Sequence, residues 1–154
     1  MTTRVIATDR RPAHDDPMTN TTTTTTTTAI AGTPTLTVAV DTHLRAYCEP
    51  DPETRADLLA AVWAPTGAVF DPPFEGEGVD AIAAMTDVVL THYAGHTFRR
   101  TTDVDAHHTF GRYEWELVAP DGAVAVTGTD IVETDIDGRL TRIVGFFGPL
   151  TSVA

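Results

Sequence analysis

After Gly95 the residue pattern is strand-like to the end of the predicted domain, and this change most constrains the fold. Before Gly95, apolar residues recur at helical spacing in three segments. After it, four segments rich in β-branched and aromatic residues follow one another between turn signals: His96–Asp105, Thr109–Val118, Ala123–Thr134 and Arg139–Phe147. This order predicts an α+β domain in which helices cover one face of a curved antiparallel sheet.

The first predicted helix begins at Leu36, and its apolar stripe of Val40, Leu44 and Tyr47 places Tyr47 on the buried side. The second helix spans about Pro52–Ala64. Asp51 fits its N-cap, and a proline in the first turn has the right φ and needs no hydrogen bond.

The sequence Pro65-Thr66-Gly67 is expected to end the second helix, and a short strand, Ala68–Asp71, follows it. The third predicted helix spans about Val79–Tyr93. Between that strand and this helix, the pair Pro72-Pro73 predicts an edge hairpin or a loop over the mouth of a cavity, because proline donates no hydrogen bond to a sheet.

The N-terminal residues 1–35 differ in composition from the rest of the chain. They hold the unbroken threonine run Thr21–Thr28 and few large apolar side chains, so they are expected to form a disordered tail. Translation from Met18 instead of Met1 stays an open alternative. The compact domain is predicted to span residues 36–150.

The charge of the chain argues against two classes of partner, and its cysteine content argues against a disulfide. The formal net charge is -12, and all ten basic residues are arginines. Such a surface repels nucleic acid and anionic lipid, so neither is expected as a partner. Cys48 is the single cysteine, which leaves no intramolecular disulfide. No apolar run is long enough to cross a bilayer and no signal peptide is evident, so we expect a cytoplasmic protein.

Asp130 is the most informative residue of the strand-like half. In the strand Ala123–Thr134 it shares a side with Val124, Val126 and Val132. A carboxylate on an apolar face is costly unless it is paired, hydrogen-bonded or protonated. The alternative interpretation is a turn or helix-bonding aspartate whose face is wrongly assigned.

Asp71 and Tyr47 are two further polar residues in apolar surroundings. Asp71 follows Val69 and Phe70 at the end of the predicted short strand, and its simplest role is a turn carboxylate before proline. Tyr47 is by itself most simply a core tyrosine with a bonded hydroxyl.

From about Leu36 to Leu150 the chain resembles the NTF2-like superfamily, the cystatin-like α+β cone of ketosteroid isomerases and SnoaL-like polyketide cyclases. The order of helices, hairpin and strands fits this family. The closing segment Asp135–Gly148 resembles the last hairpin of SnoaL-like domains.

The resemblance implies roles for three residues. Tyr47 stands where ketosteroid isomerases have their first oxyanion-hole tyrosine, and Asp71 stands where they have the general base, in an Asp-Pro step. Asp130 stands where they have a neutral aspartic acid that donates the second oxyanion hydrogen bond. The valines beside Asp130 would raise its pKa, as that role requires.

Some residues depart from the isomerase pattern. Thr86 or a neighbour stands where the isomerases have a supporting tyrosine. His107, His108 and Arg112 lie near or on pocket strands. SnoaL-like cyclases use a sheet aspartate as acid and base, often with a histidine near it, so Asp130 with His107 or His108 is an alternative site. Both alternatives imply proton transfer next to a carbonyl group.

Arg112 and Glu114 alternate with aromatic residues and are expected on the solvated face, although the reverse arrangement would resemble limonene epoxide hydrolases. His107 and His108 point to opposite faces if they lie in a strand, so no metal site is expected, and no cofactor is expected either. The predicted lining of the substrate pocket is Trp63, Phe70, Tyr113, Trp115, Ile143, Phe147 and His108.

Three functions follow as hypotheses. The first is a cofactor-independent isomerase or cyclase acting on a hydrophobic carbonyl compound, with Tyr47, Asp71 and Asp130 as its catalytic residues. The second is a ligand-binding or accessory domain without turnover, and the third is a dimerisation module. In each case we expect a homodimer that forms through the open sheet face.

Overall fold

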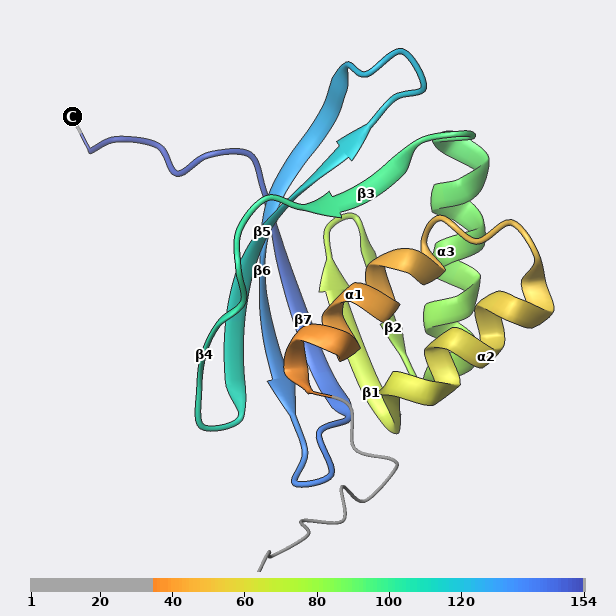
Figure 1. Ribbon diagram of the computed structural model, residues 1–154, viewed down its shortest axis with the longest axis vertical. Helices are drawn as coiled ribbons and strands as arrows, with labels where there is room; N and C mark the ends of the chain where they lie inside the picture. The colour runs from red at the N-terminus through yellow and green to blue at the C-terminus, as the bar shows by residue number, and fades with distance from the viewer. Residues whose placement is uncertain (1–34, 154) are drawn as a thin grey trace, which may run out of the picture.

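A computed structural model describes residues 35–153. The predicted tail therefore lies almost wholly outside the described residues, as does Met18. Three helices form, α1 (Leu36–Ala46), α2 (Pro52–Val62) and α3 (Val79–His92). The strands are β1 (Trp63–Asp71), β2 (Phe74–Glu77), β3 (Thr97–Arg100), β4 (Asp105–His107), β5 (Phe110–Val118), β6 (Val124–Thr134) and β7 (Leu140–Phe147) (Figure 1).

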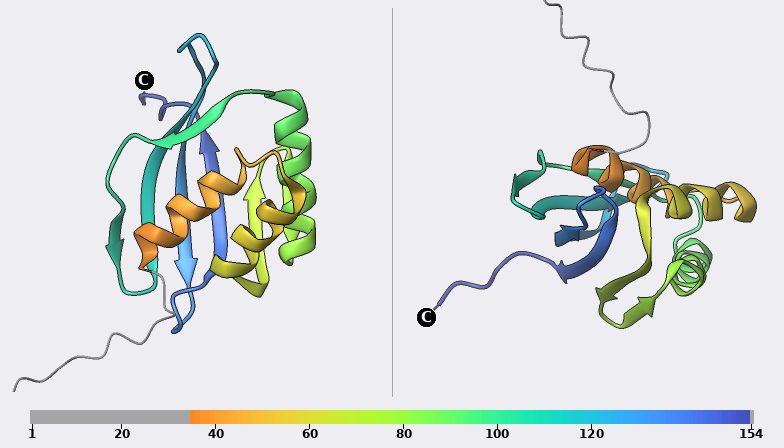
Figure 2. Two further views of the ribbon diagram at one scale, coloured as in Figure 1. Left: turned by 45° about the vertical axis from the view of Figure 1, so that its right-hand side comes forward. Right: turned by 90° about the horizontal axis from the view of Figure 1, so that it is seen from below.

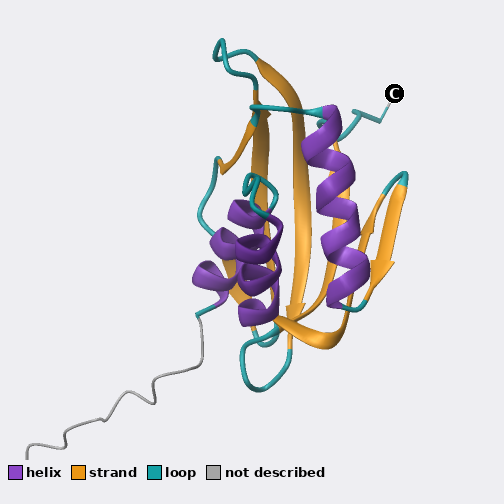
Figure 3. Ribbon diagram, turned by 90° about the vertical axis from the view of Figure 1, so that its right-hand side faces the viewer, coloured by secondary structure: helices purple, strands orange, loops and turns teal. Residues whose placement is uncertain are grey.

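The strands of the described region form one curved, unclosed sheet in the order β2-β1-β7-β6-β5-β3, and β4 also pairs with β5. All three helices lie on the same side of this sheet (Figures 2 and 3). The predicted α+β class is confirmed. The sheet is mixed, however, because the C-terminal strand β7 inserts beside β1 and runs parallel to it. None of the helices described is long and apolar enough to cross a membrane.

The predicted second helix ends two residues early, at Val62. Trp63 already has extended backbone angles, and the nine-residue strand β1 starts there. The sequence Pro65-Thr66-Gly67 lies inside this strand, in a stretch where the register with β7 shifts. A Cβ atom at Gly67 would collide with the Trp63 ring and lie 2.9 Å from the Leu140 carbonyl oxygen, so glycine is needed for this close approach.

The other boundaries lie close to those expected. The Asp51 side chain caps α2 by accepting a hydrogen bond from the Thr54 backbone N–H at 2.8 Å. The predicted strand His96–Asp105 is divided into β3 and β4, which both pair with β5. The intervening residues leave the ladder, where the Thr102 hydroxyl accepts a hydrogen bond from the Glu114 backbone N–H.

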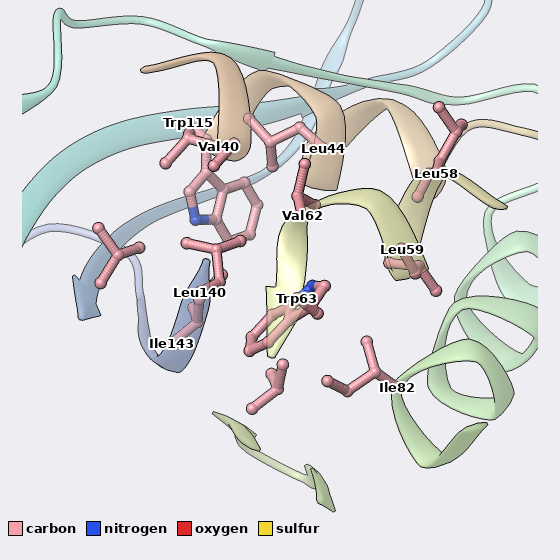
Figure 4. Packing of buried hydrophobic residues seen from close by; sticks show 14 of the residues in the cluster. Val40, Leu44, Leu58, Leu59, Val62, Trp63, Ile82, Trp115, Leu140 and Ile143 are labelled. Carbon is pink, nitrogen blue, oxygen red and sulfur yellow. The ribbon is translucent and has the colours of Figure 1, made fainter. Parts of the chain in front are cut away.

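The hydrophobic core lies between the helices and the sheet. Figure 4 shows side chains of α1, α2 and α3 gathered around Trp63 at the start of β1, with Leu140 and Ile143 of β7 next to them. Trp63 is 1% exposed and Leu140 is fully buried. This packing fixes the start of β1, and the candidate site lies around the other end of the same strand.

Arg55 of α2 is a buried cation that joins α2 to α3 and to the loop between α1 and α2. It is 4% exposed, and its guanidinium donates hydrogen bonds to the backbone carbonyls of Glu49 and Pro50 at 2.7 and 3.3 Å. It also pairs with Asp87 of α3. The loop that follows Tyr47 is therefore held against α2 and α3.

We expect Arg55→Met to lower the free energy of unfolding by about 2–3 kcal/mol, because two carbonyl groups lose a charged donor inside the protein. Urea unfolding measures this loss. Arg45→Met, at an exposed position of α1, is the control. A loss no greater than that of the control would contradict a role for Arg55 in joining the helices.

Candidate functional site

A cavity of about 300 Å³ lies between the helices and the inner face of the sheet. Much of its lining is aromatic: Tyr47, Phe74, Tyr93, Phe98, Trp115 and Phe147. Its titratable side chains are His43, Tyr47, Asp71, Tyr93 and Asp130, and its lining contains no arginine. The cavity is thus an apolar space with two acids and no cationic partner for them.

Asp71 and Asp130 approach each other across Gly145. Asp71 ends β1 and Asp130 lies on β6, and β7 separates these two strands. Gly145 of β7 pairs with Asp130 in register. A Cβ atom at Gly145 would lie 3.2 Å from Asp130 Oδ1, and it would lie even closer to Asp71 Oδ1. Because glycine leaves this space open, two carboxyl groups from non-adjacent strands share one site.

Asp130 is held by two donors from the neighbouring strand β5. It is 5% exposed. The Tyr113 hydroxyl donates to Oδ2 at 2.6 Å, and the Trp115 indole N–H donates to Oδ1 at 2.7 Å. Burial raises the pKa of Asp130 to about 6, and the hydrogen bonds from Tyr113 and Trp115 limit this rise because they favour the charged form.

Asp71 has different surroundings. Its Oδ1 atom is closed to solvent and has no hydrogen-bond partner within the described residues. Burial, and then the negative charge of Asp130, raise the pKa of Asp71 to about 7. Of the two carboxyl groups, Asp130 therefore ionises first, and Asp71 is the one whose proton is exchanged near neutral pH.

The hydrogen bonds of Asp130 differ from the expected ones. A neutral Asp130 that donates a hydrogen bond was expected from the sequence. Trp115 offers only a donor, and the two oxygens of Asp130 both accept. This geometry favours an ionised Asp130. The valine-rich strand face was correctly assigned, and burial there does raise the pKa of Asp130, but hydrogen bonds from Tyr113 and Trp115 limit the rise.

Tyr47 lines the same cavity from the C-terminal end of α1, where it is the C-cap residue. It is 7% exposed, and no hydrogen bond of its hydroxyl is present in the described part of the chain. Burial, followed by the charges of Asp71 and Asp130, raises its pKa above the usual value, so the hydroxyl keeps its proton. Tyr47, Asp71 and Asp130 are thus brought together; their catalytic roles stay predictions.

Only some of the residues predicted to line the pocket line the cavity in the structure. Trp115, Ile143 and Phe147 line the cavity. Tyr113 lies behind Asp130 and reaches it through its hydroxyl. Trp63 is buried in the core, and Phe70 points to the outer face because Val69 and Asp71 on either side of it point inward.

His108 is also outside the cavity. It occupies an exposed turn with a φ of 55°, where its ring meets that of His107. Arg112 and Glu114 lie on the solvated face, as expected, and Arg112 pairs there with Asp105. The alternative site of Asp130 with His107 or His108 is therefore wrong. Thr86 is fully buried and donates to the Ala83 carbonyl instead of lining the cavity.

His43 is the residue that the sequence analysis missed. It is 4% exposed, lines the cavity and accepts a hydrogen bond from the Trp63 indole. It lies three residues after Val40 and four before Tyr47, so the helical stripe already contained it. No group of three potential metal ligands occurs in residues 35–153.

Comparison with solved structures gives a relative of substantial identity. No protein-family model and no curated protein matches the chain. A proposed isomerase of the SnoaL-like family from Agrobacterium tumefaciens is 35% identical, with a TM-score of 0.69; the match covers 72% of this chain and 95% of that one.

Two further solved structures are similar in fold. An NTF2-like protein of unknown function from Exiguobacterium is 17% identical with a TM-score of 0.58, and the match covers 73% of this chain and 99% of that one. A proposed polyketide cyclase from Sinorhizobium meliloti is 19% identical with a TM-score of 0.56, over 70% of this chain and 93% of that one.

The raised pKa of Asp71 has a consequence for stability. Its folded pKa of about 7 lies above the unfolded value of about 3.9, so the folded state binds more protons between these values. Its contribution to stability is present below about pH 4 and is lost as the pH rises toward about 7. We expect Asp71→Asn to stabilise the protein relative to wild type more at about pH 8 than at about pH 4.

Urea unfolding of both proteins across this pH range measures that difference. Asp80→Asn, at an exposed position of α3, is the control and should show little change with pH. A difference for Asp71→Asn that stays flat, or that shrinks as the pH rises, would contradict the surroundings described for Asp71.

Proposed function

The chain belongs to the SnoaL-like family, and we propose that it is a cofactor-independent enzyme that moves a proton next to the carbonyl group of a small hydrophobic molecule. The observation that carries this proposal is the unpartnered Asp71 Oδ1, which is closed to solvent inside an aromatic cavity. A carboxylate that only supports the fold is normally hydrogen-bonded when buried. A general base needs a lone pair free to take a proton and a pKa near the working pH.

In the proposed reaction, the substrate carbonyl oxygen accepts a hydrogen bond from the Tyr47 hydroxyl. Asp71 takes a proton from the neighbouring carbon. The C–H bond breaks, its electrons move into the carbonyl group to form an enolate, and an O–H bond forms on Asp71. Asp71 then returns the proton to another carbon, which completes an isomerisation with no net change in atoms or charge.

Asp130 would support this reaction through its charge and not as a donor. Its negative charge is fixed by Tyr113 and Trp115, and it raises the proton affinity of Asp71. Asp71 thereby becomes a stronger base than an exposed aspartate, while it still ionises near neutral pH.

The size and charge of the cavity limit the substrate. A volume of about 300 Å³ is at the lower end for ligand pockets, about 300–1,000 Å³. We therefore propose a compound of one or two rings. Two acidic groups without a lining arginine disfavour an anionic substrate, because nothing in the lining would offset its charge. The proposed activity of the Agrobacterium relative, an isomerase, supports the reaction class.

We expect Asp71→Asn to lower kcat/KM about 10²–10⁴-fold, measured with a cyclic β,γ-unsaturated ketone and with proton abstraction from benzisoxazole. Asp80→Asn is the matched control and should keep full activity. If wild type is no more active than Asp71→Asn on either compound, the proton-transfer proposal fails. Unchanged ligand binding in that case would favour the alternative, a binding domain without turnover.

The pH dependence of kcat/KM tests the role of Asp130 separately. A base is active only when ionised, so activity should rise with pH through about 7, the pKa of Asp71. In Asp130→Asn the neighbouring charge is gone, and the inflection should move to lower pH. An inflection that stays in place, or moves to higher pH, would show that Asp130 does not set the basicity of Asp71.

We also propose that a second copy of the chain covers the open face of the sheet. Phe70, Val144 and Ile131 lie side by side across β1, β7 and β6, and Phe70 and Ile131 are 43% and 44% exposed. The charged residues around this row include two ion pairs, Arg112–Asp105 and Arg142–Glu133. Two such faces can meet with little repulsion, despite the acidic surface elsewhere.

Sedimentation of wild type should give the mass of two chains, and Ile131→Glu should shift it to one chain because it buries a charge in the contact. Ile136→Glu, at a loop position that is 96% exposed, should leave the dimer intact. A wild-type protein that sediments as one chain, or an Ile131→Glu dimer, would contradict this contact.

A further inference from the structure

His43 is a buried histidine that lines the cavity, with one ring nitrogen hydrogen-bonded and the other without a partner among residues 35–153. The Trp63 indole N–H donates a hydrogen bond to His43 Nδ1 at 3.2 Å. An indole nitrogen is only a donor, so Nδ1 must carry the lone pair. In a neutral imidazole the single proton then resides on Nε2, which becomes a hydrogen-bond donor.

The surroundings of His43 keep the ring neutral. It is 4% exposed, and burial lowers its pKa to about 3. The titratable groups around the cavity are Tyr47 on α1, Asp71 on β1, Tyr93 after α3 and Asp130 on β6. Neither carboxylate forms an ion pair with His43 among the contacts of residues 35–153. Near neutral pH the ring therefore carries no charge.

The second ring nitrogen of His43 has no hydrogen-bond partner in the described part of the chain. Among side-chain polar atoms of the described residues that are closed to solvent, Asp71 Oδ1 alone lacks a hydrogen bond. His43 Nε2 makes no hydrogen bond of its own, so it is not one of the closed atoms, and His43 lines the cavity. The Tyr47 ring lies one helical turn later, with ring centres 4.9 Å apart at 71°. Two polar groups of α1 are thus unpartnered beside the same space.

We propose that His43 is a second hydrogen-bond donor to the carbonyl oxygen of the substrate, through Nε2–H, and that Trp63 is a positioning residue that fixes this tautomer. This inference rests on the proposed function. It gives His43 the role of second hydrogen-bond donor, which was expected of a neutral Asp130 from the sequence. A neutral imidazole stabilises an enolate oxygen by hydrogen bonding, and its N–H is too weak an acid to protonate that oxygen fully.

A structural role alone fits the geometry less well. A histidine that only filled the core would have partners on both nitrogens or be replaced by an apolar ring, because an unused polar atom costs free energy on burial. His43 accepts a hydrogen bond from Trp63 on one nitrogen, has no described partner on the other, and lines the cavity.

The tautomer is measured directly by ¹⁵N NMR of the full chain. We expect the His43 Nε2 to be protonated and Nδ1 not, with no change between about pH 5 and about pH 8. In Trp63→Phe, which removes the indole donor, a mixture of tautomers should appear. A protonated Nδ1 in wild type, or a ring that titrates near its ordinary pKa of about 6.5, would overturn the proposal.

Ligand binding tests the donor without requiring turnover. 2-Naphthol carries an oxygen that can accept a hydrogen bond from Nε2–H, and naphthalene is its apolar counterpart. His43→Phe keeps an aromatic ring but removes the N–H, so it should weaken 2-naphthol binding about tenfold or more and leave naphthalene binding unchanged. His43→Gln, which retains an N–H donor, should restore part of the loss.

The control is His92→Phe, at an exposed position of α3, which should bind both compounds like wild type. Equal weakening of both compounds by His43→Phe would mean a packing role, and no weakening would mean that Nε2–H does not reach the oxygen; either result overturns the proposal. Because these measurements use binding alone, they give a result even if the protein catalyses no proton transfer, and that failure would appear separately in the Asp71→Asn assay.

Discussion

The pair of hydrogen bonds that Tyr113 and Trp115 donate to Asp130 is the interaction on which the site depends. Without them a carboxylate on the inner face of the sheet would take up a proton, since burial raises its pKa. With them Asp130 keeps a negative charge in an apolar cavity. The three residues lie on two adjacent antiparallel strands, in which Tyr113 stands directly opposite Asp130. The register of β5 with β6 thus determines the electrostatics of the cavity.

Burial, and then this fixed charge, raise the pKa of Asp71. Gly145 lets the two carboxyl groups approach across a strand that would otherwise separate them. Both groups are partly withdrawn from water, but only Asp130 has donors, so the cost of ionisation falls mainly on Asp71. A pair of acids in unequal surroundings is a common way to obtain one stable charge and one exchangeable proton near neutral pH.

The fold was largely predictable from the sequence, and the chemistry of the site only in part. Helix caps and the alternating residues of β6 depend on local physics, which the sequence records directly. The parallel pairing of β1 with β7 depends on contacts between the two ends of the domain, and no local pattern encodes it. The sequence predicts a raised pKa for Asp130, but not the hydrogen bonds that limit the rise, because their donors lie on the neighbouring strand β5. His43 was missed because a histidine on an apolar stripe has the same spacing as a core residue.

The proposed donors to the substrate oxygen would show how individual side chains adapt a scaffold that a family shares. The relatives below 25% identity share the fold alone with this chain, and fold does not determine function. In this cavity the acids come from the sheet, whereas Tyr47 and the proposed donor His43 come from one face of α1. A shift of α1 along the sheet would change the position of both donors together and leave the acids in place. The hydrogen bond from Trp63, at the start of β1, to His43 opposes such a shift. The contact proposed to fix the His43 tautomer would therefore also hold Tyr47 and His43 at a set distance from Asp71.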